Sequence, residues 1–157
     1  MKTSVKTGFS FGLTSGIITT LGLMVGLNAS THSRLAVIGG IITVAVADTF
    51  SDSLSMHVSS EATRNKKQKI WESTFSTLLA KLFFALIFLI PILLFPLEQA
   101  ITASVALGLI LLGLYSAHIA KTRNSKPLKA VTEHIAIALG VIFATHYLGN
   151  LISTVFA

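Results

Sequence analysis

The sequence contains no cysteine and few charged residues. The absence of cysteine excludes disulfides, thiolate metal sites and cysteine nucleophiles. Charged residues make up 11% of the 157 residues, whereas a soluble domain carries about a quarter. The charges that are present lie in clusters between long uncharged stretches. This distribution is typical of a membrane protein, in which apolar spans alternate with polar loops.

Signatures of nucleic-acid binding and of enzymes are also missing. The formal net charge is +6, but the basic residues lie between apolar runs and not on one folded face, so we expect no nucleic-acid partner. No HExxH or P-loop pattern occurs, and GLTSG at Gly12–Gly16 places its serine one position too late for a GxSxG elbow. We therefore expect a protein that is not an enzyme and needs no cofactor.

Five apolar runs have about the 20 residues that a helix needs to cross a bilayer. They predict an all-α, polytopic membrane protein with a single transmembrane domain over residues 1–157, whose first partner is the lipid bilayer. The connections are short and polar, so none of them can hold a soluble domain. The expected spans are residues 8–27, 35–58, 75–95, 101–119 and 131–155.

Lysine and arginine accumulate on one side of these spans. Cytoplasmic loops carry the excess of Lys and Arg, so this side is expected to face the cytosol. The N-terminus is then cytoplasmic, the C-terminus is outside, and the protein is a multi-pass protein of the cell membrane. The opposite side has only Arg34, whereas the cytoplasmic side has Lys2, Lys6, Arg64, Lys66, Lys67, Lys69, Lys121, Arg123, Lys126 and Lys129.

Small residues recur every four positions in the first and last spans. This spacing puts them on one helix face, where they let another helix approach closely. The partner helix could belong to the same subunit or to a second one. The stripes are Gly8, Gly12 and Gly16, then Gly22 and Gly26, then Ala136, Gly140 and Ala144. Pro91 should bend or end the third span.

The second span carries the residues that indicate a function. Asp48, Asp52 and Met56 are four apart, so they form one gently winding stripe on a helix, with Ser55 beside it. If Val58 marks the cytoplasmic end, Asp52 lies about 9 Å deep and Asp48 about 15 Å deep. Carboxylates at such depth are costly and usually functional. Together with a thioether they suit Fe²⁺ or Mn²⁺, and they could also carry protons.

Other readings of these residues remain open. Either carboxylate could be structural, and Met56 could simply fill the core. Ser15 and Thr19 on the first span have depths matching the two carboxylates, yet membrane hydroxyls often bond their own backbone. Lys81 is long enough to extend back to the headgroups. The alternative is that Lys81 serves as the counter-ion of a buried carboxylate.

Two further carboxylates are candidates for an accessory transport path. Glu61 lies at the cytoplasmic mouth of the second span, and Glu133 begins the last span, where Lys129 can pair with it. A membrane phosphotransferase that binds Mg²⁺ through Asp48 and Asp52 is a less favoured alternative. Such an enzyme needs more acidic residues and an arginine-rich site, which the other spans do not provide.

Three segments resemble the vacuolar iron transporter family. FGLTSGIITTLGLMVGL is similar to the family's first span, whose pattern runs close to FGLxDGLxTxxxLVxGL. ADTFSDSLSMHVSSE resembles the second span, in which an acidic residue is followed eight positions later by Met. KPLKAVTEHIAIALGVIFATHYLGNLI resembles the last span. The likeness extends over nearly the whole chain. The order and spacing of the three segments are together fairly specific to the family.

This resemblance implies a homodimer of five-helix protomers that exports Fe²⁺ or a similar ion from the cytosol in exchange for protons. It equates Asp48 with the family's intramembrane acid and Met56 with its Met ligand. The family's first-span Asp falls at Ser15, and we expect Asp52 to replace it from the neighbouring helix. Many members insert a Glu-rich metal-binding domain after the second span, where this chain has only the basic residues 64–69.

The sequence therefore predicts a short divalent metal transporter that moves Fe²⁺ or Mn²⁺ and works as a homodimer. The predicted metal ligands are Asp48, Asp52 and Met56. The main alternative is a non-transporting membrane scaffold of the same fold, in which Asp48 and Asp52 share a proton for structural reasons.

The expected topology predicts which introduced cysteines react with a membrane-impermeant thiol reagent. Thr3→Cys and Ser125→Cys should react only from the cytosolic side, and Glu98→Cys only from outside. Because the chain has no cysteine of its own, each variant carries one reactive site. Labelling of positions 125 and 98 from the same side would contradict the five-span arrangement.

Overall fold

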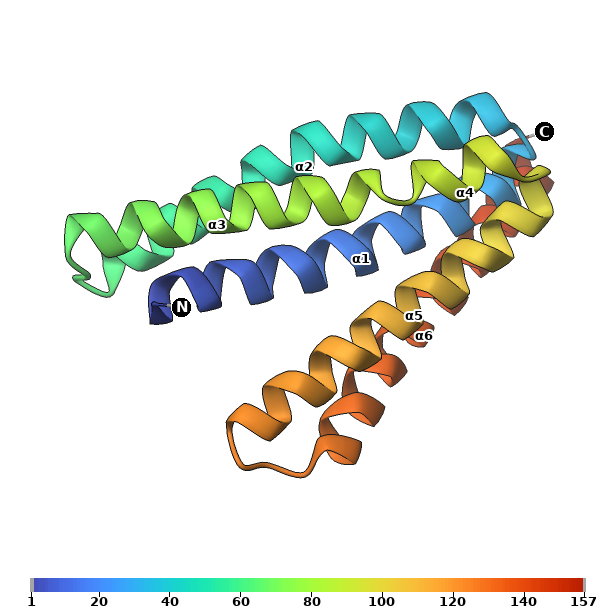
Figure 1. Ribbon diagram of the computed structural model, residues 1–157. Helices are drawn as coiled ribbons and strands as arrows, with labels where there is room; N and C mark the ends of the chain where they lie inside the picture. Colours follow the sequence, from blue (N-terminus) through green and yellow to red (C-terminus); the bar gives the residue numbers. More distant parts are fainter. Residues whose placement is uncertain (1, 157) are drawn as a thin grey trace. The chain divides into compact units, whose positions relative to one another are not determined.

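The protein is helical throughout the part that the structure describes. This computed structural model covers residues 2–156, and Met1 and Ala157 at the two ends of the predicted domain lie outside the described residues (Figure 1). The helices are α1 (Thr3–Thr31), α2 (Arg34–Ala62), α3 (Lys67–Leu86), α4 (Leu89–Leu94), α5 (Leu97–Thr122) and α6 (Pro127–Phe156).

Five helical segments are long and apolar enough to cross a membrane. They are α1, α2, the α3–α4 pair over Lys67–Leu94, α5 and α6, with mean hydropathies between 1.5 and 2.5. The predicted all-α, five-span membrane architecture is confirmed, and the chain is a multi-pass integral membrane protein. The side of the membrane on which each terminus lies stays a prediction.

The helices extend further than the apolar runs. The connection expected over residues 59–73 shrinks to four residues between Ala62 and Lys67. Hydropathy identifies only the part of a helix that lies in the hydrocarbon core. The polar residues next to each apolar run continue the same helix beyond that core. The turns between long helices each contain one residue with positive φ, namely His32, Arg64 and Asn124.

The third span is interrupted close to Pro91, as the sequence predicts. Helix α3 ends at Leu86, and α4 begins at Leu89. Proline has no N–H to bond the carbonyl four residues earlier, and its ring crowds that carbonyl. For Pro91 this carbonyl belongs to Ile87, which lies in the break between the two helices.

The chain forms two compact units, and α1 and α2 contribute to both. Unit 1 contains the described residues up to Thr20 together with Gly39–Leu89. Unit 2 contains Leu21–Ile38 and the described residues from Ile90 onward.

In unit 1, the glycine stripe of α1 lies directly against α3 (Figure 1). A Cβ atom added at Gly12 would lie 2.6 Å from the carbonyl oxygen of Thr77 and 2.9 Å from the backbone nitrogen of Lys81. One added at Gly16 would lie 3.0 Å from the carbonyl oxygen of Lys81. Of the two readings of this stripe, packing within one subunit is therefore correct.

In unit 2, the second glycine pair of α1 packs against α6. A Cβ atom at Gly22 would lie 2.8 Å from a methyl group of Val141, and one at Gly149 would lie 2.5 Å from the Gly26 carbonyl oxygen. Helices α5 and α6 run side by side (Figure 1). Gly140 has nothing within 4 Å of an added Cβ, so this part of the α6 stripe is open.

The close approach of α1 to α3 predicts that even one methyl group at Gly12 destabilises the protein. Gly12→Ala should lower the free energy of unfolding by about 1–3 kcal/mol, because the new atom would overlap backbone atoms of α3. Thermal unfolding in detergent measures this change. Gly39→Ala is the matched control, since nothing lies within 4 Å of its Cβ, and its stability should not fall. Equal stability of both variants would contradict the close packing.

Candidate functional site

Helix α2 presents both predicted carboxylates inside unit 1. Asp48 and Asp52 are one turn apart, and their side chains are 29% and 20% exposed. Exposed apolar side chains such as Val46, Phe50 and Leu54 lie along another face of the same helix, as suits a helix that contacts lipid. The two carboxylates are thus the charged stripe of an otherwise apolar span.

Lys81 of α3 lies between these carboxylates. Its side chain is only 2% exposed, and its Nζ atom is 2.5 Å from Asp48 Oδ2. The same Nζ atom donates a hydrogen bond to Asp52 Oδ2. The expectation that Lys81 extends to the headgroups is therefore wrong, and the counter-ion reading is correct. Two carboxylates within reach stabilise the ammonium group locally, so the side chain does not have to reach water.

Ser15 of α1 completes the group. Its Oγ atom donates a 2.7 Å hydrogen bond to Asp52 Oδ2 and accepts a 3.0 Å hydrogen bond from Lys81 Nζ. The hydroxyl therefore bonds side chains of two other helices, and the reading in which it bonds its own backbone is wrong. We call Ser15, Asp48, Asp52 and Lys81 the Lys81 cluster.

The glycines of α1 explain how these three helices can meet at one point. Gly12 and Gly16 both lie against backbone atoms of Lys81, so α1 and α3 approach with no side chain between them. Ser15 lies between these two glycines in the sequence and reaches α2 from there. The small-residue stripe thus positions the polar cluster.

The cluster leaves one acceptor incompletely used. Asp48 Oδ2 is buried and makes no hydrogen bond to any described residue, although it lies within ion-pairing distance of Lys81. Lys81 is thus in ion-pair contact with both carboxylates and donates a hydrogen bond to Asp52. With all three groups ionised, the cluster carries a net charge of −1, from two carboxylates and one ammonium.

The remaining predicted site residues take different places. Met56 and Thr19 are half-buried, one turn beyond Asp52 and Ser15 along their helices. Ser55 is exposed and donates to the Ser51 carbonyl of its own helix. Glu133, in unit 2, lies 3.9 Å from Lys129, as the spacing predicts, and both side chains are exposed.

Glu61 lies at the C-terminal end of α2, whereas Asp48 lies near the middle of this helix. It lines a pocket of about 400 Å³ together with His57, Asn65, Lys67, Ile70 and Trp71. The His57 ring packs against the Trp71 indole at 4.8 Å, and its Nδ1 atom is 3.1 Å from Thr74 Oγ1. Glu61 is therefore at an opening of unit 1 and not in the Lys81 cluster.

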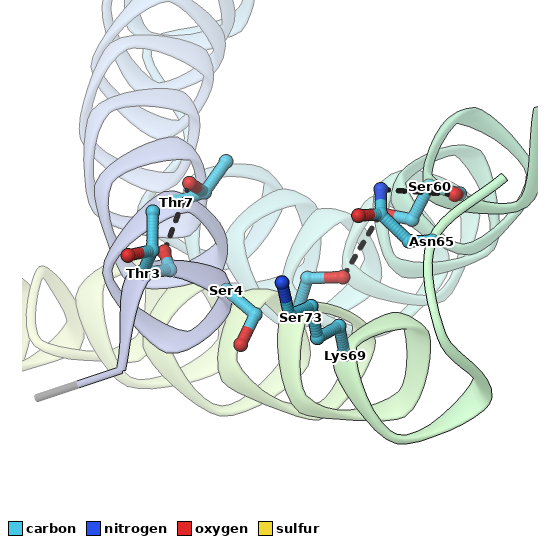
Figure 2. Close-up of a pocket in the computed structure, with 7 residues that line it drawn as sticks. All are labelled: Thr3, Ser4, Thr7, Ser60, Asn65, Lys69 and Ser73. Atoms are coloured by element: carbon cyan, nitrogen blue, oxygen red, sulfur yellow. Dashed lines mark hydrogen bonds between the residues drawn. The ribbon is translucent and has the colours of Figure 1, made fainter. Parts of the chain in front are cut away.

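A second pocket of unit 1 was not foreseen from the sequence. Figure 2 shows its side chains, which come from the start of α1, the end of α2, the turn after α2 and the start of α3. It has a volume of about 160 Å³ and is lined by Thr3, Ser4, Thr7, Ser60, Asn65, Lys69 and Ser73. Divalent ions prefer carboxylate ligands, and this lining contains hydroxyls, an amide and an ammonium group instead. The pocket is therefore a poorer place for a divalent cation than the carboxylates of α2.

Only some of the predicted metal-binding side chains lie close together in the structure. Within residues 2–156, no three His, Asp or Glu side chains gather as a metal site. The Lys81 cluster supplies two carboxylates and one hydroxyl around an ammonium group. The two carboxylates thus bind a cation, and this cation is the ammonium group of Lys81.

The helices and this cluster define a multi-pass membrane protein with an ionic site inside its spans. Residues 52–150 match the model of the VIT family. The match covers more than half of the 157 residues, so the chain belongs to the VIT family, and the predicted resemblance is confirmed. Membership implies transport of metal ions across a membrane. Comparison with curated proteins gives no match.

The matched segment begins within the candidate site. It includes Asp52 and Met56 on α2 and Lys81 on α3, whereas Ser15 and Asp48 precede it. The geometry of the Lys81 cluster is therefore what connects Ser15 and Asp48 with the family segment.

The ion pair predicts a stability difference between two carboxylate-to-amide substitutions. Removing one partner of a buried ion pair costs about 3–5 kcal/mol when the other charge is left alone. In Asp52→Asn, Lys81 still pairs with Asp48 and position 52 is partly exposed, so we expect a loss of about 1–2 kcal/mol. Glu133→Gln, in an exposed pair, should cost less than about 0.5 kcal/mol. Thermal unfolding of both variants in detergent measures the difference. Equal losses would mean that the Lys81–Asp52 pair does not form.

Proposed function

We propose that this protein exports a divalent metal ion, Fe²⁺ or Mn²⁺, from the cytosol across the cell membrane in exchange for protons. The observation that carries the proposal is the pair of carboxylates, Asp48 and Asp52, inside a span of a VIT-family chain. Charged groups within membrane spans are costly, and they mark ion pathways in most proteins that keep them.

The chemistry of the donors supports a transition metal. Asp48 and Asp52 offer carboxylate oxygens one turn apart, and Met56 adds a thioether on the next turn of the same helix. Hard oxygens with one soft sulfur suit Fe²⁺ or Mn²⁺ better than Ca²⁺ or Mg²⁺. Ser15 brings a hydroxyl to Asp52 from α1, which supports Asp52 as the substitute for an acid missing at position 15.

Exchange with protons would use the same oxygen atoms. A carboxylate must be deprotonated to bind a metal ion, so metal and protons compete for it. Release of the metal outside would let Asp48 and Asp52 take up protons for the return step. One site would in this way alternate between its two cargoes.

The other candidates suggest a route toward this site. Glu61 and His57 line the pocket at the end of α2 and could receive the ion first. Ser55 lies between Glu61 and Asp52 along the helix, and Thr19 extends the polar face of α1 beyond Ser15. Glu133, at the start of α6 in unit 2, is proposed as an accessory carboxylate independently of this route.

A homodimer is part of the proposal. Ala136, Gly140 and Ala144 are exposed along α6, and Gly140 has open space around it. Small residues at this spacing allow close contact between membrane helices. A second copy of the chain could therefore pack against this stripe.

One observation favours the scaffold alternative. Lys81 already compensates one of the two negative charges of Asp48 and Asp52 and contacts both groups, so the pair has a stabilising cation without a metal ion. In a scaffold the Lys81 cluster would hold α1, α2 and α3 together and would do nothing else.

Metal flux into proteoliposomes separates the two functions. Wild-type protein should transport Fe²⁺ or Mn²⁺, faster when a pH gradient supplies protons for exchange, and Asp48→Asn should lower the flux at least about tenfold because one of two carboxylate ligands is lost. Glu98→Gln is the matched control, since this exposed carboxylate lies outside the Lys81 cluster, and its flux should equal that of the wild type. Wild-type flux no greater than that of Asp48→Asn, for every divalent ion tried, would support the scaffold.

A further inference from the structure

The ammonium group of Lys81 lies where a metal ion bound by both carboxylates would have to lie. Divalent ions coordinate carboxylate oxygens at about 2.0–2.6 Å. Lys81 Nζ is 2.5 Å from Asp48 Oδ2 and is also in contact with Asp52 Oδ2. A metal ion bound to both of these oxygens would overlap the ammonium nitrogen. Lys81 and a metal ion therefore cannot both hold these two Oδ2 atoms at the same time.

We propose that Lys81 is a built-in competitor cation, which occupies the Asp48–Asp52 site in the metal-free protein and must be displaced by an incoming divalent ion. The inference rests on the proposed metal site and adds to it the residue that controls its occupancy. It assigns to Lys81 a role in affinity and selectivity.

The surroundings of Lys81 fit such a displacement. Its ammonium is hydrogen-bonded to Ser15 Oγ at 3.0 Å as well as to Asp52, so Ser15 can keep one bond to it when the carboxylates are lost. A lysine side chain also has a flexible four-carbon stem, which allows its charge to move while the backbone stays in place. The backbone of Lys81 is fixed by its contacts with Gly12 and Gly16.

The competition would also select for the charge of the cargo. A monovalent ion brings the same charge as the ammonium it replaces and gains nothing from the two carboxylates. A divalent ion brings twice that charge, so its attraction to the pair is about twice as large at equal distance. Lys81 would in this way exclude abundant monovalent ions and prevent tight retention of the divalent one.

The test is Mn²⁺ binding to the purified full-length protein by equilibrium dialysis, without any transport step. Lys81→Met removes the charge and keeps a chain of similar length, and Lys81→Leu removes the charge without adding a thioether. Both should bind Mn²⁺ at least about tenfold more tightly than the wild type. Lys81→Arg keeps a competing cation and should stay close to the wild type. Lys121→Met removes an exposed lysine at the end of α5 and controls for the change in overall charge; it should have no effect.

The possible outcomes separate this inference from the proposed function. Tighter binding by Lys81→Met that is lost on adding Asp48→Asn supports the competitor role, even if the wild type binds no Mn²⁺ and the proposed function fails. Wild-type binding that Lys81→Met leaves equal or weaker overturns the competitor role and leaves the proposed function standing. Absence of Mn²⁺ binding in both proteins contradicts both proposals.

A second pair of variants covers the possibility that Lys81→Met does not fold. Lys81→Met with Asp52→Asn keeps the cluster charge of the wild type, because two carboxylates and one ammonium give −1 and one carboxylate alone also gives −1. This double variant should bind Mn²⁺ at least about tenfold more tightly than Asp52→Asn alone, in which Lys81 still pairs with Asp48. Equal binding by these two proteins would overturn the competitor role.

Discussion

The burial of the Lys81 ammonium between two carboxylates is the interaction on which the rest of unit 1 depends. A charged group inside a membrane span is costly unless partners surround it, and these partners come from two other helices. Three helices can reach one ammonium group only if they lie very close together. Gly12 and Gly16 permit this because they place no side chain between α1 and the backbone of Lys81. The polar cluster therefore depends on the apolar packing, because the close approach at the glycines brings the charged groups within reach of one another.

The contact between Lys81 and the two carboxylates also bears on the function of the protein. The site has the acidic groups that a divalent ion needs, and it also has a cation of its own in contact with both. Whether the protein is a transporter or a scaffold then depends on a single property, which is how readily the ammonium group leaves the carboxylates. Asp48 Oδ2 is held only by its ion pair with Lys81, whereas Asp52 Oδ2 also accepts a hydrogen bond from Ser15, so we expect an incoming ion to begin displacing Lys81 at Asp48.

Membership in the VIT family and the geometry of the site cover different parts of the chain. The family match begins at Asp52 and extends through Lys81 to residue 150, so the first span and Asp48 are connected to the family segment by contacts alone. The 2.7 Å hydrogen bond from Ser15 to Asp52 places the position of the missing acid directly beside its proposed substitute. A charge moved from one helix to the facing helix would stay at nearly the same point in space, which is why the chain can depart from the expected pattern and keep an acidic site.

The sequence by itself determined the five helical spans, the break near Pro91 and the stripe of Asp48, Asp52 and Met56. These features depend on hydropathy, on proline geometry and on the helical repeat, all of which act over a few residues. Only the tertiary structure decided the partners of Lys81 and Ser15, which bond across separations of 29, 37 and 66 residues. The length of a lysine side chain allows it to reach either the headgroups or a neighbouring helix. The choice between them depends on which helix lies beside it, and that is set by the fit of the α1 glycines against α3.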